Sequence, residues 1–119
     1  MTDVARDELA ARLDDEGLVL LDVRTRAEYD GSAGYGCDGR QGHIPGARHL
    51  DLHQLVAASG PEAVRALVGA PEGSEVIAYC HSGGRSEVAA QLLEQAGYAA
   101  RNYVGSWHEW SADEALPVT

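Results

Sequence analysis

A single cysteine, Cys80, opens the segment CHSGGRS, which joins an apolar run to a stretch with helical spacing. Gly83 and Gly84 let the backbone curl so that several N–H groups point to one place, and such a nest binds anions. The helix expected to open near Ser86 adds unpaired N–H groups and a partial positive charge, and Arg85 adds a full one. A thiol in these surroundings has a lowered pKa, so the segment predicts that Cys80 is a nucleophile.

The same cysteine has a plainer interpretation, as a small buried residue at a strand end with glycines that only turn the chain. The reactive interpretation is favoured because four features coincide: a strand end, two glycines, a basic residue and a helix start. His81 and Ser82 lie in the same loop. We expect both to offer hydrogen bonds to a small anionic substrate or to its acceptor.

The elements that must position Cys80 alternate along the chain. Apolar runs predict strands over residues 18–24, 75–80 and 100–104, and a short strand within 43–52. Helical spacing predicts helices over residues 5–16, with Asp3 as the cap, and over 26–30, 53–59, 61–68 and 86–97, followed by a turn or short helix over 105–113. In the 86–97 helix, Val88, Leu92 and Ala96 mark the expected apolar face.

This alternation of strands and helices indicates the α/β class, with a parallel sheet and helices on both of its faces. We expect a single domain over residues 1–119, because neither an internal repeat nor a linker interrupts the pattern. Ligand sites in such sheets form beyond the carboxyl ends of the strands. Asp22, Arg24 and Cys80 all lie at strand ends, so we expect them at one edge of the sheet.

The net charge of −10, with nine arginines and no lysine, argues against nucleic-acid or anionic-membrane partners. The first 17 residues are charged and lack the apolar core of a signal peptide, and no later apolar run is long enough to span a bilayer. We therefore expect a cytoplasmic protein. Two cysteines in different contexts do not indicate a disulfide framework.

The sequence has no standard metal-ligand spacing. A zinc site formed by Cys37, His43, Cys80 and His81 has an unusual spacing, and the adjacent residues Cys80 and His81 would chelate one ion awkwardly. We therefore expect neither a bound metal nor a cofactor.

Three separated segments resemble signatures of the rhodanese-type sulfurtransferases. YCHSGGRS (79–86) resembles the family's active-site loop, EYDGSAGYGCDGRQGHIPGARHLDL (28–52) its first signature, and YVGSWHEW (103–110) its C-terminal signature. LLDVRTRAEY (20–29) is similar to the family's first buried strand and the turn after it. The resemblance implies a three-layer fold with a central, mainly parallel five-stranded sheet.

The resemblance also implies an activity. A sulfurtransferase of this kind moves sulfane sulfur from a donor such as thiosulfate to cyanide or a thiol, through a persulfide on Cys80 and without an external cofactor. The alternative is a carrier or partner-binding module, which passes persulfide to a protein thiol without small-molecule turnover. Ser82 resembles the branch that uses 3-mercaptopyruvate, so the donor is left open.

Loop length separates this chemistry from a third possibility. Arg85 follows Cys80 with four residues between them, whereas related cysteine phosphatases and arsenate reductases have five. A shorter loop makes a tighter nest, which favours a single sulfur atom over a tetrahedral phosphate. The phosphatase or arsenate reductase interpretation is therefore the weaker one.

Several residues around the loop have two interpretations each. Arg24 either binds the substrate anion or forms an ion pair with Asp22 or the nearby loop, and Asp22 then orients it. Ser86, where the following helix is expected to begin, is predicted to be a supporting residue of the site. Cys37, in the glycine-rich segment 31–42, either attacks the Cys80 persulfide or forms a disulfide with Cys80, or is an incidental thiol. His43 is expected to be a structural hydrogen-bonding residue.

Overall fold

One five-stranded sheet, with every neighbouring pair of strands parallel, organises the computed structural model, which describes residues 2–119. The strand order is β1-β5-β4-β2-β3. The strands are β1 (Asp3–Val4), β2 (Leu18–Asp22), β3 (Arg48–His49), β4 (Glu75–Tyr79) and β5 (Ala99–Tyr103). The predicted α/β class and parallel sheet are confirmed, and β1 is the strand that the sequence pattern did not predict.

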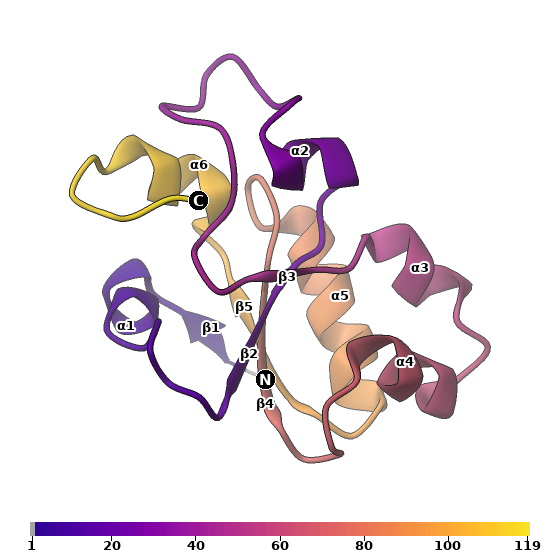
Figure 1. Cartoon of the computed structure of the whole chain (residues 1–119). Helices are drawn as coiled ribbons and strands as arrows, with labels where there is room; N and C mark the ends of the chain where they lie inside the picture. Colours follow the sequence, from indigo (N-terminus) through magenta and orange to yellow (C-terminus); the bar gives the residue numbers. More distant parts are fainter. Residues whose placement is uncertain (1) are drawn as a thin grey trace.

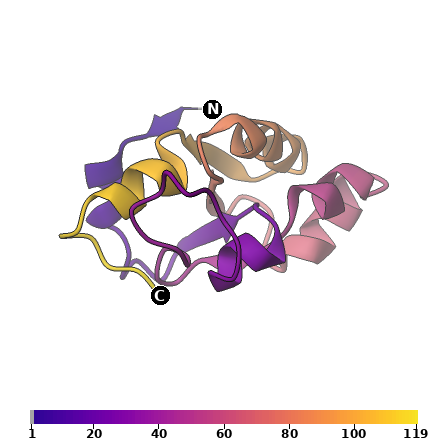
Figure 2. The ribbon, with the colours of Figure 1, turned by 90° about the horizontal axis from the view of Figure 1, so that it is seen from above.

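Residues 2–119 contain six helices, and five of them pack on the two faces of the sheet (Figures 1 and 2). The six helices are α1 (Arg6–Ala10), α2 (Arg26–Asp30), α3 (Leu52–Ala57), α4 (Pro61–Val68), α5 (Gly84–Gln95) and α6 (Ser106–Ala112). Helices α3, α4 and α5 pack on one face, and α1 and α6 pack on the other. The three-layer arrangement expected from the family resemblance is therefore confirmed.

The two central strands, β2 and β4, are buried on both faces, which explains their continuous apolar sequences. Leu20 lies opposite Ile77 in the register, and both side chains face α1 and α6. Their neighbours Leu21 and Ala78 also lie opposite each other and face α3, α4 and α5. The strict alternation of faces along a strand thus builds two separate apolar cores from two short segments.

The first helix is much shorter than expected. It ends at Ala10 instead of residue 16, and its cap residue is Ala5, which makes no side-chain capping bond. Asp3 does not cap the helix because it belongs to β1, where it pairs with Asn102 of β5. After the helix the chain continues in turns, and the Arg12 guanidinium holds this segment against β4 with hydrogen bonds of 2.8 and 2.6 Å to the Glu75 carboxylate.

Helix α5 also differs from its sequence-based description. It begins at Gly84, and Val88, expected on the apolar face, is 43% exposed. The buried side chains include Ala89, Ala90 and Leu93. The other two residues expected on this face, Leu92 and Ala96, do pack against the core, so the prediction was wrong only at Val88.

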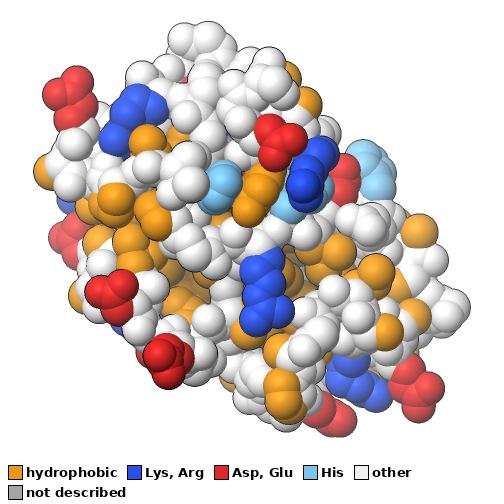
Figure 3. All heavy atoms as spheres, viewed as in Figure 1, with side chains coloured by type: hydrophobic (Ala, Val, Ile, Leu, Met, Phe, Trp, Pro, Cys, Tyr) orange, Lys and Arg blue, Asp and Glu red, His pale blue; other side chains and the backbone are white. Residues whose placement is uncertain are grey.

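The carboxyl ends of β2, β4 and β5 lead into the residues of interest, as the parallel topology predicts. The glycine-rich segment 31–42 leaves α2 and passes beside α6 in both ribbon views (Figures 1 and 2). On the face shown in Figure 3, acidic and basic side chains are scattered and form no broad basic patch. Among residues 2–119, no helix is both long enough and apolar enough to cross a membrane.

Candidate active site

Cys80 lies in the turn between β4 and α5, and it is only 1% exposed. The Gly83 N–H group donates a hydrogen bond to the Cys80 Sγ atom at 3.1 Å, and the buried Ser86 hydroxyl donates to the same atom at 3.4 Å. Both donors come from the loop and the first turn of α5. The predicted nest around the sulfur is therefore present in the structure.

The surroundings of Cys80 favour the thiolate. Burial raises the pKa of the thiol, but hydrogen bonds from the Ser86 side chain and from the backbone N–H groups of Ser86, Gly83 and Ser82 outweigh this, so the pKa of Cys80 lies below its ordinary value. Converging donors that stabilise a sulfur anion are the chemical requirement for nucleophilic attack and for holding a charged sulfur intermediate.

The backbone at Gly83 admits only glycine. Its φ angle of +97° lies in the left-handed region, and a Cβ atom placed there would approach the Val104 carbonyl oxygen to 2.6 Å. The Asn102 side chain donates to the Gly83 carbonyl at 3.1 Å and fixes the turn from β5. Gly84, in contrast, has open space around it and begins the helix.

Helix α6 holds the active-site loop from the other side. The Trp107 N–H group donates to the Cys80 carbonyl at 2.9 Å, and the His108 N–H group donates to the His81 carbonyl at 3.0 Å. The Cys80 N–H group donates in turn to the Ser106 hydroxyl at 3.1 Å. The C-terminal signature thus positions the loop through two backbone hydrogen bonds and the Ser106 hydroxyl.

Arg85 is engaged by an acidic residue that the sequence analysis did not single out. Its guanidinium donates to both carboxylate oxygens of Glu28 in α2, at 2.9 and 3.1 Å. Glu28 also accepts bonds from Thr25, whose side chain caps α2. Burial raises the pKa of Glu28, but these hydrogen bonds, with that from Arg85 the strongest, lower the pKa to about 2. Arg85 therefore contacts Glu28 rather than the thiol, and its role toward a substrate stays a prediction.

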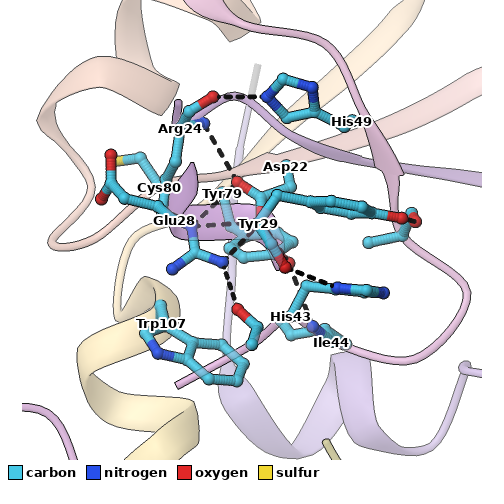
Figure 4. A network of polar contacts seen from close by, with 12 residues as sticks. Asp22, Arg24, Glu28, Tyr29, His43, Ile44, His49, Tyr79, Cys80 and Trp107 are labelled. Carbon is cyan, nitrogen blue, oxygen red and sulfur yellow. Dashed lines mark hydrogen bonds and ion pairs between the residues drawn. The ribbon is translucent and has the colours of Figure 1, made fainter. Parts of the chain in front are cut away.

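Arg24 forms the buried ion pair that the sequence left open as an alternative. Its guanidinium donates to Asp22 at 2.6 Å and to the Gly42 carbonyl of the glycine-rich segment at 2.6 Å, above the Trp107 ring (Figure 4). The Tyr79 hydroxyl donates to Asp22 at 2.9 Å. Arg24 is 1% exposed, and these hydrogen bonds join the end of β2 to the glycine-rich segment. A contact between Arg24 and a substrate anion stays a prediction.

The remaining predicted residues lie in different places: Ser82 in the loop, His81 and Cys37 near Asp38 and His108, and His43 on Tyr29. Ser82 is exposed in the loop, and His81 faces Asp38, with its Nε2 atom 2.9 Å from the Asp38 Oδ1 atom. Cys37 is an exposed free thiol whose sulfur lies 4.0 Å from the His108 Nδ1 atom, and a Cys37–Cys80 redox reaction stays a prediction. His43 lies elsewhere, with its ring stacked on Tyr29 at 3.8 Å, which agrees with its expected structural role.

A family model described as a rhodanese-like domain matches residues 5–113. The chain belongs to this family. This rhodanese-like domain is 35% identical over 109 residues to the putative thiosulfate sulfurtransferase SseB of Mycobacterium tuberculosis, in an alignment that covers 86% of this chain and 38% of that protein. It is also 33% identical over 114 residues to the sulfur carrier protein TtuD of Thermus thermophilus, with 83% of this chain and 40% of that protein covered.

Solved structures agree with this membership. The crystal structure of a probable thiosulfate sulfurtransferase superposes with a TM-score of 0.83 at 40% sequence identity, and the match covers 98% of this chain and 46% of that one. The rhodanese-like domain described here therefore spans less than half the length of each of these three proteins. The comparisons place it in the rhodanese-like family.

Proposed function

We propose that this domain transfers sulfane sulfur from a small anionic donor such as thiosulfate to a thiophilic acceptor, through a persulfide on Cys80. The observation that carries the proposal is the position of the Cys80 sulfur, 3.1 Å from the Gly83 nitrogen and 3.4 Å from the Ser86 hydroxyl. These donors surround a buried thiol whose pKa is lowered. The family membership and the names of the relatives support the same chemistry.

The reaction proceeds in two displacements. The Cys80 thiolate attacks the outer sulfur of thiosulfate, the S–S bond of the donor breaks, and sulfite leaves with the electron pair. The product is Cys80–S–S⁻, whose terminal anion the N–H groups of the nest stabilise. Cyanide or a thiolate then attacks the terminal sulfur and departs with it, which regenerates the Cys80 thiolate without any external oxidant or reductant.

The residues around Cys80 have distinct roles in this proposal. The nest consists of the backbone N–H groups of Ser82, Gly83 and Ser86 together with the Ser86 hydroxyl, and Gly84 lets the loop turn into α5. The side chains of Ser82 and His81 bind the donor or the acceptor. Arg85 supplies a fixed positive charge near the sulfur. Its pKa is raised above the ordinary value mainly by the hydrogen bond to Glu28, and to a lesser degree by the charge of Cys80. Asp22 acts indirectly by holding Arg24 and the strand end.

A persulfide carrier is the second candidate. One of the relatives, covered over 40% of its length, is named a sulfur carrier protein. A carrier accepts sulfur on Cys80 and passes it only to a specific protein thiol, whereas an enzyme turns over with cyanide or small thiols. Steady-state thiocyanate production therefore separates the two candidates.

Phosphatase or arsenate reductase chemistry is disfavoured by the placement of Arg85. Those reactions need a guanidinium that binds a tetrahedral oxyanion above the nucleophile. Here both terminal nitrogens of Arg85 bind Glu28 instead. The nest that remains around Cys80 suits one charged sulfur better than a phosphate.

The proposal is tested by intact-protein mass spectrometry after incubation with thiosulfate and then with excess cyanide. We expect a gain of about 32 Da, the mass of the sulfur in the covalent intermediate, which maps to Cys80 and disappears with cyanide. Cys80→Ser must abolish the gain, and Cys37→Ser must leave it in place. No gain with thiosulfate, 3-mercaptopyruvate or a persulfide donor would refute the proposal. The single-domain organisation and cytoplasmic location stay predictions.

A further inference from the structure

Four side chains with metal-binding atoms meet beside the active-site loop: a thiol, a carboxylate and two imidazoles. They belong to Cys37 and Asp38 of the glycine-rich segment, to His81 after the nucleophile and to His108 of α6, and their ligand atoms all lie within 4.8 Å of one another. We infer that this cluster is a binding site for a divalent transition metal of the zinc type.

Asp38 provides an observation that is independent of the clustering. Its side chain is 1% exposed, and its Oδ1 atom accepts from His81 and His108, each at 2.9 Å. The Oδ2 atom is buried and has no hydrogen-bond partner among the described residues. A buried carboxylate oxygen without a partner is costly, and a bound cation supplies the missing interaction.

The distances between the ligand atoms are close to those of a four-ligand zinc site. Zinc bonds of about 2.0–2.3 Å in a tetrahedron place neighbouring ligand atoms about 3.3–3.8 Å apart. The separations in this structure lie on both sides of this range. The Asp38 Oδ1 atom is 2.9 Å from His81 Nε2 and 2.9 Å from His108 Nδ1, and the Cys37 Sγ atom is 4.0 Å from His108 Nδ1. Shifts of about an ångström or less in side chains would admit the ion, and the protons now shared with Asp38 would be released.

The donor set selects the class of metal. Two imidazoles with one thiolate suit borderline ions such as Zn²⁺, whereas Mg²⁺ and Ca²⁺ prefer sets made only of oxygen atoms. Carboxylate, thiolate and imidazole together give four ligands, the number that zinc takes at structural sites. We therefore name Zn²⁺ as the ion that the cluster fits.

The segment that carries Cys37 and Asp38 is fixed to the rest of the domain before any ion binds. The Arg40 guanidinium donates to four backbone carbonyls at the end of α6 and beyond it, those of Trp110, Ser111, Asp113 and Leu116. Tyr35 stacks on the His81 ring with centroids 3.8 Å apart. This anchoring lowers the entropic cost of bringing the ligands together.

This site is separate from the nucleophile and was not visible in the sequence. The four possible zinc ligands in the sequence included Cys80 and His43, but in the structure Cys80 is buried in the nest and His43 stacks on Tyr29. The ligands that meet instead come from three distant segments. A zinc ion here would join the glycine-rich segment, the active-site loop and α6, and so would stiffen the backbone next to Cys80.

The inference is tested by zinc titration in competition with a chromophoric chelator, in the full chain with Cys80→Ser so that the active-site thiol binds no metal. We expect one Zn²⁺ per chain. Cys37→Ser and His108→Gln, each added to this background, should weaken binding at least about tenfold, since even outer-shell partners of a metal have that effect. His53→Gln is the matched control, because this exposed histidine lies in α3, outside the cluster, and should leave the affinity unchanged.

Cobalt(II) gives a second readout that does not depend on affinity alone. A tetrahedral site with one thiolate shows intense visible bands and a sulfur-to-metal charge-transfer band, and Cys37→Ser should remove the latter. Zinc should also raise the melting temperature of the Cys80→Ser chain but not that of the His108→Gln variant, whose fold circular dichroism would verify.

Two results would overturn the inference. One is equal zinc affinity in the parent, Cys37→Ser and His108→Gln chains. The other is zinc binding that disappears when Cys80 alone is replaced. Neither result bears on the proposed sulfur transfer, because metal binding is measured directly and in the absence of a sulfur donor.

Discussion

The lowered pKa of Cys80 comes mainly from hydrogen bonds donated by neutral groups rather than from a nearby arginine. The sequence drew attention to Arg85 as the source of positive charge, but its guanidinium is paired with Glu28. The groups that lower the pKa of the thiol, against its burial, are the Ser86 hydroxyl and three backbone N–H groups of the loop. The backbone N–H donors remain when a side chain is replaced, so the Ser86 hydroxyl is the one donor to the Cys80 sulfur that a substitution can remove.

Ser86→Ala should raise the pKa of Cys80 by about one to two units, because a hydrogen bond to a charged group contributes about 1.5–3 kcal/mol and one pKa unit is about 1.4 kcal/mol. The measurement is the pH dependence of alkylation by neutral iodoacetamide. Ser82→Ala is the matched control, because it removes a hydroxyl from the same loop and keeps the backbone N–H group. Identical pH midpoints for Ser86→Ala and the wild type would exclude Ser86 from the role.

At the scale of elements, the junction of β4 and α5 depends on one glycine of a pair. Gly83→Ala should lower the free energy of unfolding by about 2 kcal/mol, because alanine is strained at a φ of +97° and its Cβ would meet the Val104 carbonyl at 2.6 Å. Gly84→Ala should be neutral or slightly stabilising, since that Cβ meets nothing within 4 Å. Urea denaturation of both variants measures the difference. Equal stabilities would contradict this account of the turn.

Helix α2 is attached to the active-site loop through the Glu28–Arg85 pair, which predicts a dependence of stability on pH. The pKa of Glu28 is about 2 in the folded chain against an ordinary 4.5. A lowered folded-state pKa stabilises the protein above pH 4.5, and this contribution is lost as the pH falls toward 2. The free energy of unfolding of Glu28→Gln should therefore be about 2–3 kcal/mol lower than that of the wild type at pH 7. On acidification toward pH 2, the free energy of unfolding of the variant should fall by about that much less than that of the wild type.

The comparison is made by urea denaturation of wild type and Glu28→Gln at several pH values. Other paired carboxylates titrate in both proteins, so only the difference between the two curves reports on Glu28. Parallel curves over the whole acid range would mean that the ion pair does not hold α2 to the loop.

The sequence predicted the elements well where a local signal exists. Continuous apolar runs marked β2 and β4, and Pro61 marked the start of α4, as the structure has it. The two-residue strand β1 has no such signal, because it exists only through its pairing with β5. On the expected apolar face of α5, Leu92 and Ala96 do pack against the core, and only Val88 was misplaced, because the helical spacing does not show where the edge of the buried face lies.

The candidate site was predictable only in part for the same reason. Cys80 and its loop form one contiguous segment, whereas the groups that fix them come from elsewhere in the chain. Glu28 had a local signal, since Thr25 and Glu28 form a capping box at the start of α2. Ser106, Asp38 and His108 had none, because their roles arise from contacts across the fold.

At the scale of the whole molecule, a net charge of −10 opposes the approach of an anionic donor. The radius of gyration is 13.2 Å. In a molecule this small, charges on all sides contribute to the electrostatic potential that a donor meets at the active site. The Debye length is about 30 Å at 0.01 M salt and about 8 Å at 0.15 M, so the repulsion is felt at low salt and largely screened at physiological salt. The nest acts at contact distance, where salt has little effect.

The rate of persulfide formation with thiosulfate should therefore increase with ionic strength, by a few-fold between about 0.01 and 0.15 M salt. The second-order rate constant is measured by stopped-flow or quenched mass spectrometry at a pH where the thiol is ionised. Alkylation by neutral iodoacetamide under the same conditions is the control, and its rate should hardly change. A thiosulfate rate that falls with added salt would show that local positive charge at the mouth of the site, and not the overall field, governs how the donor approaches Cys80.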